Sequence, residues 1–176
     1  DIPGLEFAGE VEVSRGDPAR WRPGDRVMGL VGGGAQAEYV VVHEDEMLAV
    51  PPALTWAEAA AIPESFLTAY DALVTRARVA AGERVLIHAV GSGLGTAAVQ
   101  IARWLGATVI GTSRTADKLA RAVMFGMDAG IDTSEHGFRE ALTAPVDVIL
   151  DVLGAAALGD NIASLAPRGR MVMLGL

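Results

Sequence analysis

The stretch from Val85 to Thr96 constrains the fold of this chain more than any other. An apolar run that begins at Val85 leads into glycines at 91, 93 and 95, and apolar residues at helical spacing follow at 98, 101, 102 and 105. A helix start offers free backbone N–H groups and the positive end of the helix dipole, and glycines let a phosphate come close. The stretch predicts a strand, a nucleotide-binding turn and a helix. Taken alone, it also fits a tight turn without a ligand.

Strand and helix patterns alternate after this turn. We expect strands at 108–112, 129–131, 146–152 and 170–174, and helices at 115–125, 138–142 and around 158–165, the last with a stripe of Leu158, Ile162 and Leu165. The run 146–152 is nearly all apolar, as in a strand buried on both faces. This order predicts an α/β fold with a doubly wound parallel sheet of about five strands, and a sixth strand is expected beyond Leu176. In that context we interpret the glycine turn as a dinucleotide site.

The first part of the chain has a different character. It contains short β segments at 5–13, 26–31, 37–42 and 47–50, with a Gly32-Gly33-Gly34 break among them. A capping box at Thr55 and Glu58 predicts a helix over 57–62, which Pro63 interrupts, and a second helix is expected over 65–78. We therefore predict two domains, 1–62 and 63–176.

Composition excludes several classes of function. The chain has no cysteine, so it has no disulfides, thiolate zinc sites or cysteine nucleophiles. Its 14 basic and 22 acidic residues give a net charge of −8, which would repel a nucleic acid. No apolar run is long enough for a membrane span, and a cytoplasmic location is expected. Because the chain begins without Met, we also expect it to be a segment of a longer protein.

The end of the second strand after the turn indicates which dinucleotide is bound. An acidic residue there would bind the ribose 2′-OH of NAD, but this chain has Thr112-Ser113-Arg114 and then Lys118. A guanidinium binds a 2′-phosphate, whereas a carboxylate would repel it. The pattern favours NADP(H) over NAD(H). The alternative is that Ser113 and Thr115 cap the next helix and that Arg114 is solvated.

Several runs together resemble the zinc-independent NADPH quinone oxidoreductases, the zeta-crystallin-like branch of the medium-chain dehydrogenase/reductase superfamily. They are residues 2–11, the Gly24–Val27 turn, Tyr39-Val40, residues 59–64, residues 67–69 and the glycine turn. The resemblance covers the whole chain, and members of the family are longer at both ends. It implies part of a GroES-like catalytic domain at 1–62 and a Rossmann domain at 63–176 that is incomplete at its C-terminus.

The resemblance also implies a set of cofactor-binding residues. They are Thr68, Ala89, Ser92, Gly93, Leu94, Gly95, Ser113, Arg114, Lys118, Leu153 and Gly175. Ser92 stands where the family has a glycine. A serine at this position resembles the branch of inducible NADPH quinone reductases, which reduce ortho-quinones by single electrons. Thr133 stands where the family often has a tyrosine, which leaves the phosphate to Ser113, Arg114 and Lys118 and predicts a lower NADP affinity.

The sequence assigns no catalytic residue and no metal ligand. The zinc-dependent relatives carry a ligand histidine where this chain has Leu5, and His43, His88 and His136 are scattered. We interpret His88 as a structural residue at a strand end. Asp147 and Asp151 are interpreted as capping or loop-bonding residues near the cofactor cleft. The Gly32–Gly34 loop and Glu64-Ser65 either line the substrate cleft or form a hairpin turn and a helix cap.

The resemblance implies NADPH-dependent reduction of a small-molecule quinone or α,β-unsaturated carbonyl, without a metal. Two alternatives stay open: an enoyl reductase, free-standing or from a polyketide-type assembly, and an NADPH-binding structural or regulatory protein. A homo-oligomer is expected for the full-length protein. The physiological substrate, the proton donor, the choice between one-electron and hydride transfer, and the activity of this segment alone are left open by the sequence.

Overall fold

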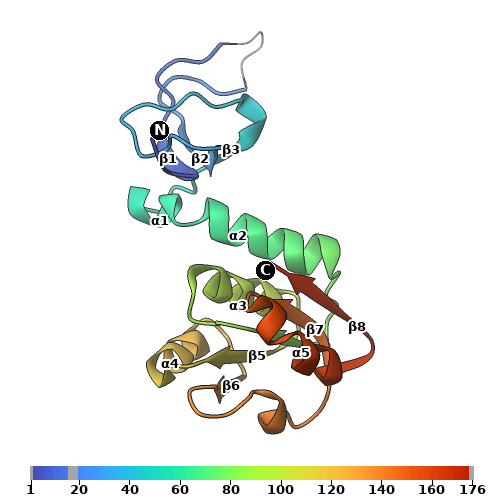
Figure 1. Ribbon diagram of the computed structural model, residues 1–176. Helices are drawn as coiled ribbons and strands as arrows, with labels where there is room; N and C mark the ends of the chain where they lie inside the picture. Colours follow the sequence, from blue (N-terminus) through green and yellow to red (C-terminus); the bar gives the residue numbers. More distant parts are fainter. Residues whose placement is uncertain (1, 16–19, 175–176) are drawn as a thin grey trace. The chain divides into compact units, whose positions relative to one another are not determined.

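The computed structural model describes residues 2–15 and 20–174. The chain forms two compact units, Asp1–Leu67 and Thr68–Leu176 (Figure 1).

The N-terminal unit contains a three-stranded antiparallel sheet. Strands β1 (Glu6–Glu10), β2 (Arg26–Leu30) and β3 (Met47–Ala49) pair in that order, and the 3₁₀ turn η1 (Glu44–Glu46) precedes β3. In β1 and β2, Glu6 is opposite Leu30 and Glu10 is opposite Arg26. A small core forms around Met28, Val50 and Ala59. This unit confirms the expected β-rich character of the first fifty residues.

The strand expected at 37–42 is wrong. These residues form no helix or strand, and Tyr39 and Val41 are exposed by 75% and 99%. A strand pattern becomes a strand only where a neighbouring strand supplies hydrogen bonds. Strand β2 already has β1 and β3 on its two sides. Within residues 2–15 and 20–174, no strand is paired with residues 37–42.

Helix α1 (Trp56–Ala60) begins at the expected capping box. The Thr55 Oγ1 atom accepts from the Glu58 N–H at 3.3 Å, and the Glu58 carboxylate accepts from the Thr55 N–H at 2.8 Å. Pro63 was expected to interrupt the helical region, and it starts a new helix, α2 (Pro63–Tyr70). Proline suits the first position of a helix because the N–H that it lacks would have no partner there.

The continuous helix expected over 65–78 is wrong in its second half. Helix α2 ends at Tyr70, and Asp71–Arg76 form a π-helix, η2. The Ala77 N–H donates to the Ala72 carbonyl, five residues back, at 2.9 Å. Ala72 and Leu73 remain fully buried in this wider turn. Hydrophobic spacing does not distinguish an α-turn from a π-turn.

The C-terminal unit is built on five parallel strands, β4 (Arg84–Ile87), β5 (Thr108–Ser113), β6 (Ala129–Asp132), β7 (Val146–Asp151) and β8 (Leu165–Met173). Their order in the sheet is β6-β5-β4-β7-β8, with β8 in dark red in Figure 1. The chain runs outward from β4 to β6 and then returns to the other side of β4. The reversal lies between β4 and β7, and the predicted doubly wound fold is confirmed.

Helices connect these strands. Helix α3 (Gly93–Trp104) buries Ala97, Ala98, Ile101 and Ala102, and helix α4 (Ala116–Met124) is followed by Gly126 with a φ of 104° at its C-terminal end. A 3₁₀ turn η3 (Arg139–Ala141) replaces the short helix expected at 138–142. The turn η4 (Gly154–Ala156) and helix α5 (Leu158–Ser164) lead to β8. Leu86, Ile110 and Ile149 of three neighbouring strands share one core cluster with Phe138.

Two expectations near the C-terminus are corrected. Strand β8 begins at Leu165 and not at Arg170, with an irregularity between the pairs Val146–Leu165 and Val148–Arg170. The buried face of α5 is formed by Asn161 and Ser164, whereas Ile162 is 59% exposed. These polar side chains tolerate burial because each makes a hydrogen bond, Asn161 to His88 and Ser164 to the Asp160 carbonyl.

Candidate dinucleotide-binding site

The glycine turn joins β4 to α3 at the carboxyl end of the sheet. Ala89 has a φ of 48°, and Ser92 is the N-cap of α3. The Ser92 Oγ atom accepts from the Gly95 N–H at 3.0 Å, so this hydroxyl caps the helix. Within the described part of the chain, the N–H groups of Gly93 and Leu94 have no acceptor, as is usual for the first two residues of a helix. These two donors are available for an anion.

Gly95 allows the helix to lie directly on the turn. A Cβ atom at this position would be 2.6 Å from the Val90 carbonyl oxygen and 2.7 Å from that of Ala89. Both neighbours are backbone atoms, which cannot move aside as a flexible side chain can. The glycine is therefore required for the close approach of α3 to the end of β4.

The two cations that the sequence singled out follow β5, with Arg114 in the loop before α4 and Lys118 in the first turn of α4. The Ser113 Oγ atom accepts from the Thr115 N–H at 3.1 Å, and Thr115, the N-cap of α4, makes no side-chain cap. Arg114 and Lys118 are exposed, and neither forms an ion pair with any residue that the structure describes. Lys118 lies in the first turn of α4, where the helix dipole disfavours a cation. An anion bound beside it would remove that cost.

Lys118 also reaches the glycine turn. A Cβ atom built on Gly91 would be 2.5, 2.8 and 2.9 Å from Cβ, Cγ and Cδ of Lys118. The aliphatic stem of this lysine therefore lies against the backbone of Gly91. The contact links the β4–α3 turn to the first turn of α4.

Leu153 follows the adjacent strand, β7. The Asp151 Oδ1 atom accepts from the Leu153 N–H at 2.8 Å, and Leu153 is 47% exposed. Because β4 and β7 are parallel neighbours, Leu153 and the glycine turn follow the same edge of the sheet, on either side of the reversal. Asp151 thus has the expected loop-bonding contact near this edge.

Asp147 is not near this edge, contrary to expectation. Its carboxylate accepts from the N–H of Arg84, the first residue of β4, at 2.8 Å. Asp147 therefore lies at the amino end of the sheet, because parallel strands begin at the same edge.

Two of the remaining candidate residues lie in or directly after other elements. Thr133 follows β6 and donates its N–H to the Ser113 carbonyl at 2.9 Å. Thr68 is half-buried within α2, and the structure gives its side chain no hydrogen bond with a described residue. Gly175 lies outside the described residues.

A buried polar group lies behind the turn. His88 is 1% exposed, with Nδ1 at 2.9 Å from the Thr112 Oγ1 atom and Nε2 at 2.8 Å from the Asn161 Oδ1 atom. Burial lowers the pKa of His88 below its ordinary value of 6.5, against the opposing effects of the Asn161 hydrogen bond and the Asp151 charge. The imidazole is therefore neutral at pH 7. Among the described side chains, Asp151 Oδ2 and Asn161 Nδ2 are buried without a hydrogen-bond partner.

Asn161 was missed by the sequence reasoning. Residue 161 lies three positions after Leu158, on the same helix face as the stripe of Leu158, Ile162 and Leu165. A polar residue on that apolar face was the signal that could have identified Asn161.

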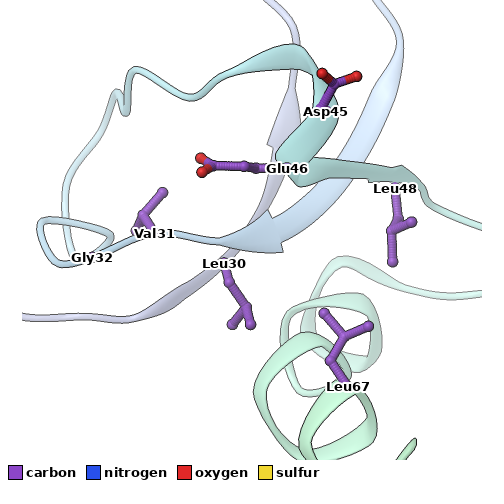
Figure 2. A pocket seen from close by; sticks show the side chains of 7 residues that line it. All are labelled: Leu30, Val31, Gly32, Asp45, Glu46, Leu48 and Leu67. Carbon is purple, nitrogen blue, oxygen red and sulfur yellow. The ribbon is translucent and has the colours of Figure 1, made fainter. Parts of the chain in front are cut away.

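The N-terminal unit contains a separate cavity of about 390 Å³, lined by Leu30, Val31, Gly32, Asp45, Glu46, Leu48 and Leu67. Figure 2 shows the side chains of Leu30, Leu48 and Leu67 pointing toward one another across it. Gly32, from the loop expected either to line a substrate cleft or to form a hairpin turn, is one of the lining residues. Glu64 is not, and its N–H donates to the Glu6 carboxylate at 2.9 Å.

Comparisons with known proteins agree with this architecture. Residues 93–176 match the family described as zinc-binding dehydrogenase, and residues 1–52 match the alcohol dehydrogenase GroES-like domain. The spectinabilin polyketide synthase system protein NorB of Streptomyces orinoci is 41% identical over 98% of this chain, which spans 8% of NorB.

Two solved structures are also similar. The CurK enoyl reductase has a TM-score of 0.91 and 31% identity, over 99% of this chain and 55% of CurK. The quinone oxidoreductase of Thermus thermophilus, also solved with NADPH, has a TM-score of 0.83 and 36% identity, over 98% of this chain and 54% of that protein.

The chain belongs to the medium-chain dehydrogenase/reductase superfamily, as its sequence indicated. It spans about half the length of the two solved relatives. No helix among the described residues is long and apolar enough to cross a membrane.

Proposed function

We propose that this chain is part of an NADPH-dependent reductase that acts on quinones or α,β-unsaturated carbonyl compounds without a zinc ion. The observation that carries the proposal is the glycine turn at the strand-order reversal, with Arg114 and Lys118 beside it at the start of α4, neither of them paired with an acidic residue that the structure describes. The superfamily assignment and the relatives described as quinone oxidoreductases and enoyl reductases support it.

The residues at the carboxyl edge of the sheet fit a dinucleotide phosphate. The N–H groups of Gly93 and Leu94 would bind the pyrophosphate, and Gly95 keeps the helix start close enough to present them. Arg114 and Lys118 would bind the 2′-phosphate, with the uncapped start of α4 beside them. Leu153 would contact the cofactor from the far side of the reversal, and Thr68 would lie near its nicotinamide end. When bound, NADPH supplies the electrons for the reduction.

The chemistry of the side chains favours a substrate that is already activated. Leu5 stands where the zinc-dependent relatives have a ligand histidine, and the chain has no cysteine. A quinone or an enone accepts electrons without a Lewis acid more easily than a simple carbonyl does. Stoichiometric zinc in the purified protein, measured by elemental analysis, would contradict a zinc-free reaction.

Enoyl reduction within a polyketide-type assembly is the second candidate. It is favoured by the 41% identity to NorB, which exceeds the 36% identity to the Thermus quinone oxidoreductase, and by the TM-score of 0.91 with CurK. Both candidates use the same cofactor edge, and they differ in the substrate.

An oxidation assay on the complete natural polypeptide separates the candidates. NADPH consumption is followed with an ortho-quinone, a para-quinone, a simple enone and an enoyl thioester side by side. Turnover of a quinone or of the simple enone supports the first candidate, and turnover confined to the enoyl thioester supports the second. Tight NADPH binding with no turnover of any of the four would indicate a structural or regulatory protein.

Cofactor preference is tested through Arg114. Arg114→Ala should weaken NADPH binding by about tenfold and leave NADH binding nearly unchanged, because NADH lacks the 2′-phosphate. Arg121→Ala, at the other end of α4, is the matched control and should change neither affinity. Equal catalytic efficiency with the two cofactors, unaffected by Arg114→Ala, would mean that Arg114 is only solvated.

A further inference from the structure

We infer that Gly91 is a positioning residue for the 2′-phosphate side of the cofactor site, because it lets the stem of Lys118 cross the glycine turn. This inference rests on the proposed NADPH function. It concerns Gly91, which belongs to the glycine turn but is not among the residues expected to bind the cofactor.

The backbone of Gly91 does not explain why this residue is a glycine. Its φ lies outside the left-handed region, and the neighbouring Ala89, with a φ of 48°, has that conformation instead. The remaining reason is close approach. A Cβ atom at 91 would overlap three consecutive carbon atoms of Lys118, at 2.5 to 2.9 Å.

This overlap cannot be relieved by a change of rotamer alone. The nearest atom is the Lys118 Cβ, at 2.5 Å, and its position is fixed by the backbone of α4. A side chain at 91 would therefore push away the first turn of α4, which carries Lys118 and begins two residues after Arg114. Glycine at 91 thus sets the spacing between the turn that would bind the pyrophosphate and the cations that would bind the 2′-phosphate.

The position of Lys118 supports the same role. Its ammonium is exposed and unpaired among the described residues, in a helix turn whose dipole disfavours a cation. The aliphatic part of Lys118 packs on Gly91 while the ammonium group stays exposed. This packing fixes the position of the positive charge.

A stability cycle tests the contact without reference to the cofactor. Gly91→Ala should lower the urea midpoint of the complete polypeptide. The same change in a Lys118→Gly background, where the overlapping side chain is gone, should leave the midpoint of that background nearly unchanged. Gly159→Ala, in α5, is the control and should not lower the midpoint, because an added Cβ atom there would meet nothing within 4 Å outside its own helix. An equal loss in both backgrounds would overturn the inference.

Dissociation constants for NADPH, NADH and 2′,5′-ADP, measured by fluorescence titration or calorimetry, test the positioning role. Lys118→Met keeps the stem and removes the charge, and it should reduce the preference for NADPH over NADH by about tenfold. Gly91→Ala should reduce the preference for NADPH to a similar extent. In the double variant, the fold-reduction in this preference should be smaller than the product of the two single fold-reductions.

Unchanged preference in either single variant overturns the inference, as does an equal weakening of NADPH and NADH by Gly91→Ala. If Gly91→Ala prevents folding, the inference is decided by two other measurements. These are the NADPH preference of Lys118→Met and the urea midpoint of the double variant Gly91→Ala with Lys118→Gly. A wild-type protein that binds neither dinucleotide overturns the proposed function itself. One that binds both dinucleotides equally leaves the reductase proposal standing with either cofactor and overturns the role of Gly91.

Discussion

The Nε2 atom of His88 lies 2.8 Å from the Oδ1 atom of Asn161, and this contact joins the end of β4 to the buried face of α5. With the 2.9 Å contact between Nδ1 and Thr112, it links three elements directly behind the glycine turn. All three residues are at most 2% exposed, so water cannot replace a lost partner. The turn is therefore supported by a polar contact as well as by apolar packing.

Asn161→Leu should destabilise the protein by about 1–3 kcal/mol, because it leaves the His88 Nε2 atom buried without a partner. Urea unfolding measures the loss. Ile162→Ala, at an exposed site of the same helix, should change stability by less than about 0.5 kcal/mol. Equal effects of the two substitutions would show that the His88 contact contributes nothing.

The folded protein should lose stability as the pH falls below 6.5, through His88. Burial lowers the pKa of His88 in the folded state, so the unfolded chain binds the proton first as the pH falls. Between the two pKa values, the free energy of unfolding falls by at most about 1.4 kcal/mol per pH unit. The loss ends once the pH is below the lowered pKa of the folded state. Unfolding curves of wild type and His88→Gln between pH 8 and 5 measure it. The stability difference between them should shrink with acidification, and a constant difference would contradict this prediction.

Gly95→Ala should destabilise the protein by about 1–3 kcal/mol, because its Cβ atom would meet two backbone carbonyl oxygens. Since α3 must move away from the turn, dinucleotide affinity should fall as well. Thermal unfolding and cofactor titration measure the two effects, with Gly159→Ala as the control for adding a methyl group. Unchanged stability would show that α3 and the turn do not need this close approach.

Arg170→Met should destabilise the C-terminal unit by about 1.5–3 kcal/mol. The Arg170 guanidinium donates to the Glu83 carboxylate at 2.7 and 2.9 Å and to the Ala77 carbonyl at 2.7 and 2.9 Å, which ties β8 to the end of η2 and the start of β4. A double-mutant cycle with Glu83→Gln measures the coupling. Arg139→Met, which removes an exposed pair with Asp160 at 3.9 Å, should cost less than about 1 kcal/mol.

The same ion pair predicts a loss of stability in acid. The hydrogen bond from Arg170 holds the pKa of Glu83 below its ordinary value of 4.5. Its contribution is present above pH 4.5 and is lost as the pH falls through the lowered pKa. Glu83→Gln should remove this part of the acid sensitivity, and an unchanged pH profile would contradict it.

The local signals of the sequence were reliable where a few neighbouring residues carry the physics. Thr55 and Glu58 form the expected capping box, and Gly126 ends α4 with a positive φ. Segment 37–42 has as strong a strand pattern as β2, yet no described strand is beside it to pair with. Hydrogen bonds between distant segments are decided by the whole fold, which is why this expectation failed.

The sequence by itself determined the doubly wound sheet, the position of the glycine turn within it, and the cations at Arg114 and Lys118. Periodicity and glycine spacing are properties of consecutive residues, so they can be read along the chain. Only the tertiary structure showed that Gly91 accommodates Lys118, that Asn161 bonds His88, and that Asp147 lies at the far edge of the sheet from the turn. These relationships join residues that are 27 to 73 positions apart, or depend on which edge of the sheet a strand end occupies. Packing in three dimensions decides them.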